Sequence, residues 1–71
     1  MNKINPGKLL NSKWTAVNPV RKETHFLVTE LEYDEEGVVV RCLIEAVISN
    51  RSEAIEWQEL TNDSKWLQGW K

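Results

Sequence analysis

Hydrophobic and polar positions alternate most regularly in the stretch VVVRCLIEAVIS, residues 38–49. Every even position in it is apolar, whereas the odd positions admit Arg41 and Glu45. A period of two residues is typical of a β-strand with one buried face, because successive side chains point to opposite faces. The pattern therefore predicts a long strand here, with Cys42 on its buried face.

A hairpin is predicted immediately before this strand. The stretch HFLVTELEY (25–33) is rich in β-branched and aromatic residues, which favour strands. DEEG (34–37) then marks a turn: Asp34 suits the first position of a type I turn, and Gly37 can take the positive φ that closes a hairpin with a bulge. The two strands on either side of DEEG are expected to pair.

The strand predicted over 25–33 does not keep its apolar residues on one face. Phe26 and Val28 share a face, but the next two even positions are glutamates, and Leu27 and Leu31 lie on the other face. A switch of face along a strand predicts a β-bulge or strong coiling, as where a small sheet curls into a barrel.

The remaining segments predict short extended elements joined by turns. SKWTAV (12–17) alternates as a strand does, and Pro19 is expected to end it because proline has no N–H for a ladder. SNRS (49–52) is a second turn. SKWLQGW (64–70) is too short for a stable helix, so a last strand or extended segment fits better.

The stretch EAIEWQELT (53–61) has two interpretations. Ser52 can cap a helix that Glu, Ala and Gln would favour. Ile55 and Trp57 also lie two residues apart, as on one face of a strand. We favour a short strand followed by a tight turn at ELTND (59–63).

These elements predict an all-β fold, a small antiparallel sheet of four to five strands curled into an SH3-like barrel. The alternative is an α+β fold, with a three-stranded sheet and a short helix near 53–61. A chain of 71 residues has room for one core. We therefore expect a flexible N-terminal lead over 1–8, where Pro6 and Gly7 are adjacent, and one compact β domain over 9–71.

A domain this small usually needs a disulfide, a structural metal or an unusually dense core to be stable, and the composition offers neither of the first two. The single cysteine, Cys42, excludes an intrachain disulfide, and with His25 as the only histidine a structural zinc site lacks its ligands. We expect no cofactor. Dense packing remains, and the four tryptophans are expected to join the core while Leu, Ile and Val contribute the larger share of it, with Trp14 close to Trp66 and Trp70 and the terminal segments side by side.

The net charge of −2 hides an uneven distribution. Residues 1–22 carry five basic residues and no acid, whereas residues 23–71 carry a net charge of −7. The two parts either attract one another within the fold or present two faces to partners. No apolar run approaches the roughly 20 residues of a membrane span, and none resembles a signal peptide. With an unpaired thiol, this predicts a cytoplasmic protein.

No catalytic constellation stands out, so we expect no enzyme. A Cys42–His25 pair would need an exposed thiolate, whereas the alternation buries Cys42. The acids at 34–36 are contiguous, unlike the spaced ligands of a calcium loop. The chain has only three glycines, too dispersed for a phosphate-binding loop.

The tripeptide Ser-Lys-Trp occurs near both ends and suggests a surface for interactions. The candidate residues are Lys13, Trp14, Lys65, Trp66 and Trp70. We expect a monomeric, non-catalytic module that binds protein or peptide through a sheet edge or a partly exposed tryptophan. The alternative is a small barrel that binds nucleic acid through its basic N-terminal segment, with Lys8, Lys13, Arg21 and Lys22. The net acidic charge weakens that alternative.

The chain resembles a family of small bacterial tryptophan-rich proteins of unknown function. The resemblance covers roughly residues 5–70, and its most specific parts are the KLL-x-SKWTA opening (8–16) and the W-x-x-G-W ending (66–70). Residues 29–52 match only loosely. The resemblance implies a compact bacterial protein, and it transfers no activity, cofactor, partner or site residue.

Overall fold

The computed structural model describes all residues, 1–71, and contains one five-stranded antiparallel sheet. The strands are β1 (Lys13–Val20), β2 (Glu23–Tyr33), β3 (Val39–Ala46), β4 (Ser52–Ile55) and β5 (Trp66–Gln68). Their order across the sheet is β4-β3-β2-β1-β5. The predicted all-β antiparallel class is confirmed. No helix of the structure has the length and apolar character needed to cross a membrane.

Two short 3-10 helices accompany the sheet, η1 (Pro6–Lys8) and η2 (Trp57–Thr61). The favoured interpretation of 53–61 is therefore right for the strand, and the tight turn after it takes the form of η2. The α+β alternative is wrong in its three-stranded sheet, because this region begins as an edge strand of a five-stranded one, whereas its short helix near 53–61 is present in part as η2. The expected strand position of Trp57 is also wrong, since the chain leaves β3 after Ile55 and Trp57 opens η2.

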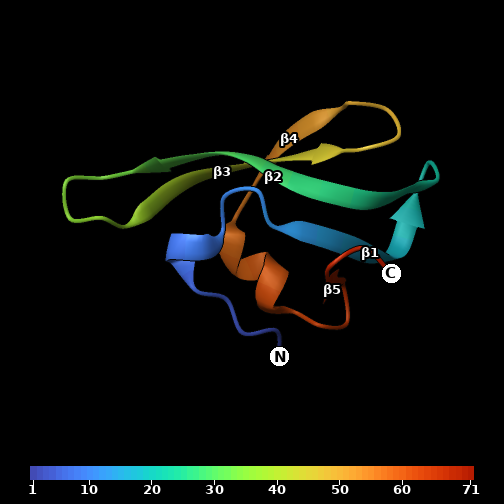
Figure 1. The fold of residues 1–71 in the computed structure, drawn as a ribbon, viewed down its shortest axis with the longest axis horizontal. Coiled ribbons are helices and arrows are strands. Elements are labelled where there is room, and N and C mark those ends of the chain that lie inside the picture. The colour runs from blue at the N-terminus through green and yellow to red at the C-terminus, as the bar shows by residue number, and fades with distance from the viewer.

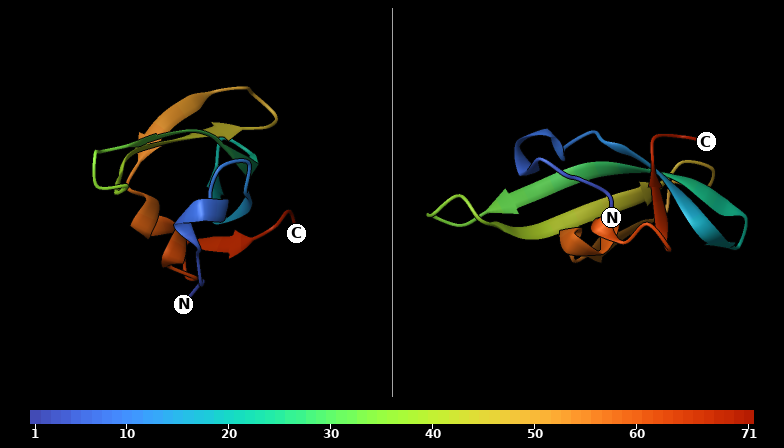
Figure 2. Two further views of the ribbon diagram at one scale, coloured as in Figure 1. Left: turned by 60° about the vertical axis from the view of Figure 1, so that its left-hand side comes forward. Right: turned by 90° about the horizontal axis from the view of Figure 1, so that it is seen from below.

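Strands β1 to β4 form an arch, and η1, η2 and the edge strand β5 lie beneath it (Figures 1 and 2). The hairpin of β2 and β3 extends beyond the other elements, and its turn lies at the far end. The core fills the concave side of the arch. Its buried apolar residues are Leu9, Trp14, Phe26, Val28, Cys42, Ile44, Ala46 and Leu60.

The two ends of the chain meet in the pairing of β1 with β5. Trp14 lies opposite Gln68, and Ala16 lies opposite Trp66. The Trp66 ring meets the Phe26 ring edge to face, with centroids 5.1 Å apart. The expectation that the terminal segments lie side by side and bring Trp14 and Trp66 into one core region is confirmed.

The tryptophans do not all enter the core, which corrects the expectation from composition. Trp14 is 2% exposed, whereas Trp57 and Trp66 are half-buried and pack against the core from its margin. Trp70 is 43% exposed. One indole is therefore fully inside, and the other buried apolar side chains come from β2, β3, η2 and Leu9, which precedes β1.

The sheet is open. β4 and β5 lie at its opposite edges, and each has one hydrogen-bonded neighbour. The predicted closure into an SH3-like barrel is therefore not confirmed by the strand pairing.

A β-bulge interrupts each long strand. On β2 the register shifts between Val28 and Glu30, at the position where the sequence predicted a change of face, so that prediction is confirmed. On β3 a second shift leaves Val40 as the extra residue, since Val39 and Arg41 oppose consecutive residues of β2.

This second bulge corrects the prediction for 38–49. The strand is shorter than expected. Val38, Val40 and Ile48 are exposed, although they occupy even positions, as Cys42 does, and were predicted to share its buried face. An extra residue reverses the faces on one side of a bulge, so a period of two cannot continue through it.

β1 continues through Pro19, contrary to the prediction that proline ends it. Between Thr15 and Val20 the pairing with β2 is irregular, and β5 pairs only with residues up to Ala16. Pro19 therefore lies where neither neighbour requires its missing N–H.

Arg21 and Lys22 form the two-residue turn that joins β1 to β2, and both have positive φ, 58° and 62°. Two left-handed residues match the type I′ turn of tight hairpins, which favours Asn-Gly. Neither Arg nor Lys relieves the steric cost of this conformation. The turn is therefore strained.

The N-terminal residues contact the end of the chain. The backbone N–H of Asn2 donates to the carbonyl of Thr61 (2.8 Å), and its side-chain amide donates to the carbonyls of Leu60 and Trp66. The side chain of Gln68 donates to the carbonyl of Lys3.

Replacing the strained turn with Asn-Gly should stabilise the protein. We expect the R21N/K22G variant to gain about 1–2 kcal/mol in the free energy of unfolding, because αL conformation costs Arg and Lys roughly 1–2 kcal/mol per residue and Asn and Gly avoid part of this cost. Urea denaturation checks this. Unchanged or lower stability would contradict the type I′ strain argument.

Replacing Trp14 by alanine should remove about 3–5 kcal/mol from the free energy of unfolding, since it empties a fully buried site. The matched variant W70A should lose about 1 kcal/mol, chiefly the hydrogen bond from the Trp70 indole. Chemical denaturation monitored by circular dichroism measures both. Equal losses would contradict the assignment of Trp14 as the central core tryptophan.

Candidate interaction surface

The structure divides the five residues that the sequence proposed for an interaction surface. Trp14 lies in the core, where its indole N–H donates to the hydroxyl of Ser12 (2.8 Å). Trp66 is half-buried against Phe26. The exposed candidates are Lys13, Lys65 and Trp70.

Lys13 and Trp70 come together on the convex face of the sheet. The ammonium of Lys13 lies 4.8 Å from the Trp70 ring centroid, a cation–π contact. The Trp70 indole N–H donates to the carbonyl of Phe26 (3.0 Å), and its ring is 6.0 Å from that of His25. One face of the Trp70 ring is thus covered by a cation of the same chain, which reduces the area left for stacking.

Lys65 and Trp66 lie elsewhere, beside a shallow cavity of about 290 Å³ that Ala16 and Asn18 also line. Trp66 pairs with Ala16 and packs against the core, so it belongs to the concave side. The two Lys-Trp stretches therefore do not form one continuous surface.

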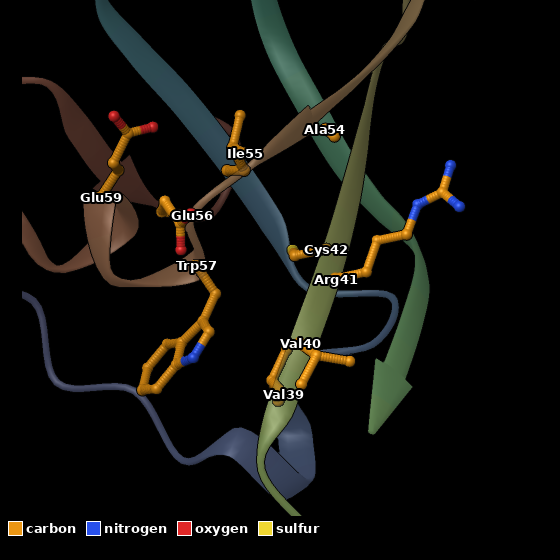
Figure 3. A pocket seen from close by; sticks show the side chains of 9 residues that line it. All are labelled: Val39, Val40, Arg41, Cys42, Ala54, Ile55, Glu56, Trp57 and Glu59. Carbon is orange, nitrogen blue, oxygen red and sulfur yellow. The ribbon is translucent and has the colours of Figure 1, made fainter. Parts of the chain in front are cut away.

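The largest hollow of the molecule lies around Trp57, a residue that the sequence analysis did not place in an interaction surface. We call it the Trp57 groove; its volume is about 350 Å³. Figure 3 shows it between β3 and the start of η2. Its lining residues are Val39, Val40, Arg41, Cys42, Ala54, Ile55, Glu56, Trp57 and Glu59.

The groove exists because β4 is shorter than β3. Ile55 pairs with Cys42 and is the last paired residue of β4, whereas β3 reaches back to Val39. The chain then turns away into η2 and places the Trp57 indole beside the unpaired part of β3. The groove thus has an apolar wall of Val39, Ile55 and Trp57.

The groove carries unpaired negative charge. Glu56 and Glu59 lie on the side opposite β3, and neither takes part in an ion pair. Arg41 points away from Trp57, and its guanidinium contacts Glu32 at 3.4 Å. The electrostatics of the groove therefore favour a cationic occupant.

Little in the sequence marked this groove. Trp57 follows Ile55 at strand spacing, and no proline, glycine or side-chain cap announces η2, whose N-cap Glu56 makes no capping hydrogen bond. The one available signal was a tryptophan that follows a glutamate, Glu56, rather than a lysine.

Cys42 forms part of the groove floor but is 1% exposed. Burial raises the pKa of its thiol, which disfavours the reactive thiolate. His25 pairs with Thr15 on β1, whereas Cys42 lies opposite Leu31 and Ile55, so the structure does not bring the two together. No three His, Cys, Asp or Glu side chains are grouped to hold a metal ion.

A partly buried ion pair fixes the β3–β4 hairpin to the start of β2. The Glu23 carboxylate is 5% exposed and accepts from the Arg51 guanidinium at 2.6 Å and from the Ser49 hydroxyl. These hydrogen bonds, with Arg51 the larger cause, lower the pKa of Glu23 from 4.5 to about 2. Arg51 also contacts Glu53 on β4 at 2.8 Å.

This ion pair makes stability depend on pH. Because the pKa of Glu23 is lower in the folded state, the stabilisation is complete above about pH 5 and is lost as the pH falls toward 2. We expect E23Q to be less stable at pH 7 and to lose less stability than the wild type on acidification. Thermal unfolding between pH 7 and 2.5 tests this, with E53Q as the exposed control. Parallel pH profiles for wild type and E23Q would contradict the assignment.

Comparison with known proteins gives one match. The family model described as Tryptophan-rich protein (DUF2389) matches residues 12–71. This match confirms the resemblance drawn from the SKWTA and W-x-x-G-W motifs. No curated protein and no solved structure matches the chain.

Proposed function

The chain belongs to the tryptophan-rich protein family, and we propose that it acts as a non-catalytic module that binds a protein or peptide. The observation that carries this proposal is the Trp57 groove beside the open end of β3. Tryptophan is one of the residue types enriched among those that dominate the binding energy of protein interfaces.

The dimensions and chemistry of the groove support this proposal. A volume of about 350 Å³ lies at the lower end of the range for binding pockets, so the groove suits one or two side chains. Its apolar wall gives affinity, and its unpaired carboxylates give orientation.

Three finer expectations from the sequence form part of the proposal. The module is monomeric and works in a bacterial cytoplasm, as its reduced cysteine and the family resemblance imply. Its sheet is an opened SH3-like barrel; support comes from the order β4-β3-β2-β1-β5 and from η2, which joins the two edge strands.

Nucleic-acid binding has weaker support. Lys8 precedes β1, whereas Arg21 and Lys22 lie beyond its other end, so these cations do not gather at one place. Lys13 is engaged with Trp70. A binding face for nucleic acid needs clustered cations beside free aromatic faces.

Selection from a random peptide library displayed on phage tests the proposal. We expect repeated rounds on the folded protein to enrich related peptides with micromolar Kd, the affinity expected for a small groove. The control is the same selection on urea-unfolded protein. No enrichment, together with salt-dependent retention on single-stranded DNA, would favour the nucleic-acid alternative instead.

A further inference from the structure

We propose that the Trp57 groove binds an extended, cationic–apolar peptide segment, which pairs with the free edge of β3 at Val39. This inference rests on the proposed function and specifies its site and ligand. The segment takes the place that β4 would occupy if it continued past Ile55.

The backbone geometry of β3 identifies the free edge. The N–H of Ala46 donates to the carbonyl of Arg51 on the β4 side, and hydrogen-bonded residues alternate along an antiparallel ladder. Ile44 and Cys42 therefore also face β4, and Cys42 pairs with its last residue, Ile55.

The bulge on β3 decides what lies beyond this last pair. The carbonyl of Val38 accepts from the N–H of Asp34, so Val38 faces β2. Alternation turns the N–H and C=O of the next residue, Val39, away from β2. Val40 is the bulged residue, and together with Arg41 it lies opposite Glu32. Val39 thus presents one free donor and one free acceptor where β4 has departed.

Side chains of the groove complement such a segment. The Val39 side chain packs at the margin of the core, and the Trp57 ring lies beside it, so an apolar side chain entering here is buried between them. Adding a strand to a sheet edge derives affinity from backbone hydrogen bonds and specificity from pockets for alternate side chains.

The negative charge of the groove determines which charged side chains the bound segment should carry. Glu56 and Glu59 lie one 3-10 turn apart, since the N–H of Glu59 donates to the carbonyl of Glu56 (2.9 Å). Both are exposed and free of ion pairs. A lysine or arginine of the segment meets these two carboxylates, whereas an acidic segment is repelled by them.

The test uses the full chain labelled with ¹⁵N and the peptide Ac-KLKVKLK-amide, with Ac-ELEVELE-amide as its acidic counterpart. We expect the lysine peptide to shift the amide resonance of Val39 and the indole N–H resonance of Trp57. N-methylation of its central valine removes the donor to the carbonyl of Val39 and should weaken binding at least about tenfold. The acidic peptide should not bind.

Two charge variants separate the groove from general electrostatic attraction. E56Q/E59Q should weaken binding of the lysine peptide about tenfold, whereas E35Q/E36Q, which removes the same charge from the neighbouring β2–β3 turn outside the lining of the groove, should change it less than about threefold. All four glutamates are exposed, so the variants should fold as the wild type does.

Several outcomes would overturn the inference. They are no binding of the lysine peptide, equal weakening in both variants, equal binding of the acidic peptide, and resonance shifts confined to Ser52 and Ala54 on the outer edge of β4. If phage selection yields binders that leave Val39 and Trp57 unperturbed, the groove assignment fails while the proposed function stands. If selection yields none, the proposed function itself fails.

Discussion

The pairing of β1 with β5 is the constraint on which the rest of the structure depends. The chain has no disulfide, so its two ends are joined by a ladder of three residue pairs, Trp14 with Gln68 to Ala16 with Trp66. This ladder seats Trp66 on Phe26 and covers the concave side of the sheet. Loop closure over almost the whole chain costs conformational entropy, and the indoles at both ends offset that cost by burying large apolar surfaces.

The way in which the core is covered also explains why part of β3 has no strand partner at the other edge of the sheet. η2 and β5 bring Leu60 and Trp66 to the core from beneath the arch, so β4 ends after four residues and the chain crosses under the arch. Covering the core from below therefore leaves β3 without a partner at Val39. The Trp57 groove is a consequence of how a short chain closes its core, and the Glu23–Arg51 pair holds the hairpin that borders it.

Local sequence patterns predicted the elements well where each pattern had a local cause. Asp34 and Gly37 specify the turn between β2 and β3. The Asp34 carboxylate accepts hydrogen bonds from two backbone N–H groups, and Gly37 adopts a φ of 82°. The change of face after Val28 predicted the bulge on β2. The bulge at Val40 left no such trace, because Val38, Val39 and Val40 are identical residues and the apolar even positions continue unchanged to Cys42.

The sequence by itself determined the class of fold, the hairpin over 25–46, the family, and the meeting of the chain ends, because periodicity, turn chemistry and aromatic content are properties of neighbouring residues. Only the tertiary structure decided which tryptophan is buried and which is exposed. Trp14, Trp57, Trp66 and Trp70 are chemically identical, and their burial depends on strand partners far along the chain. The candidate site also depends on the tertiary structure. Val39 and Trp57, two residues of its apolar wall, are brought together because β4 ends at Ile55.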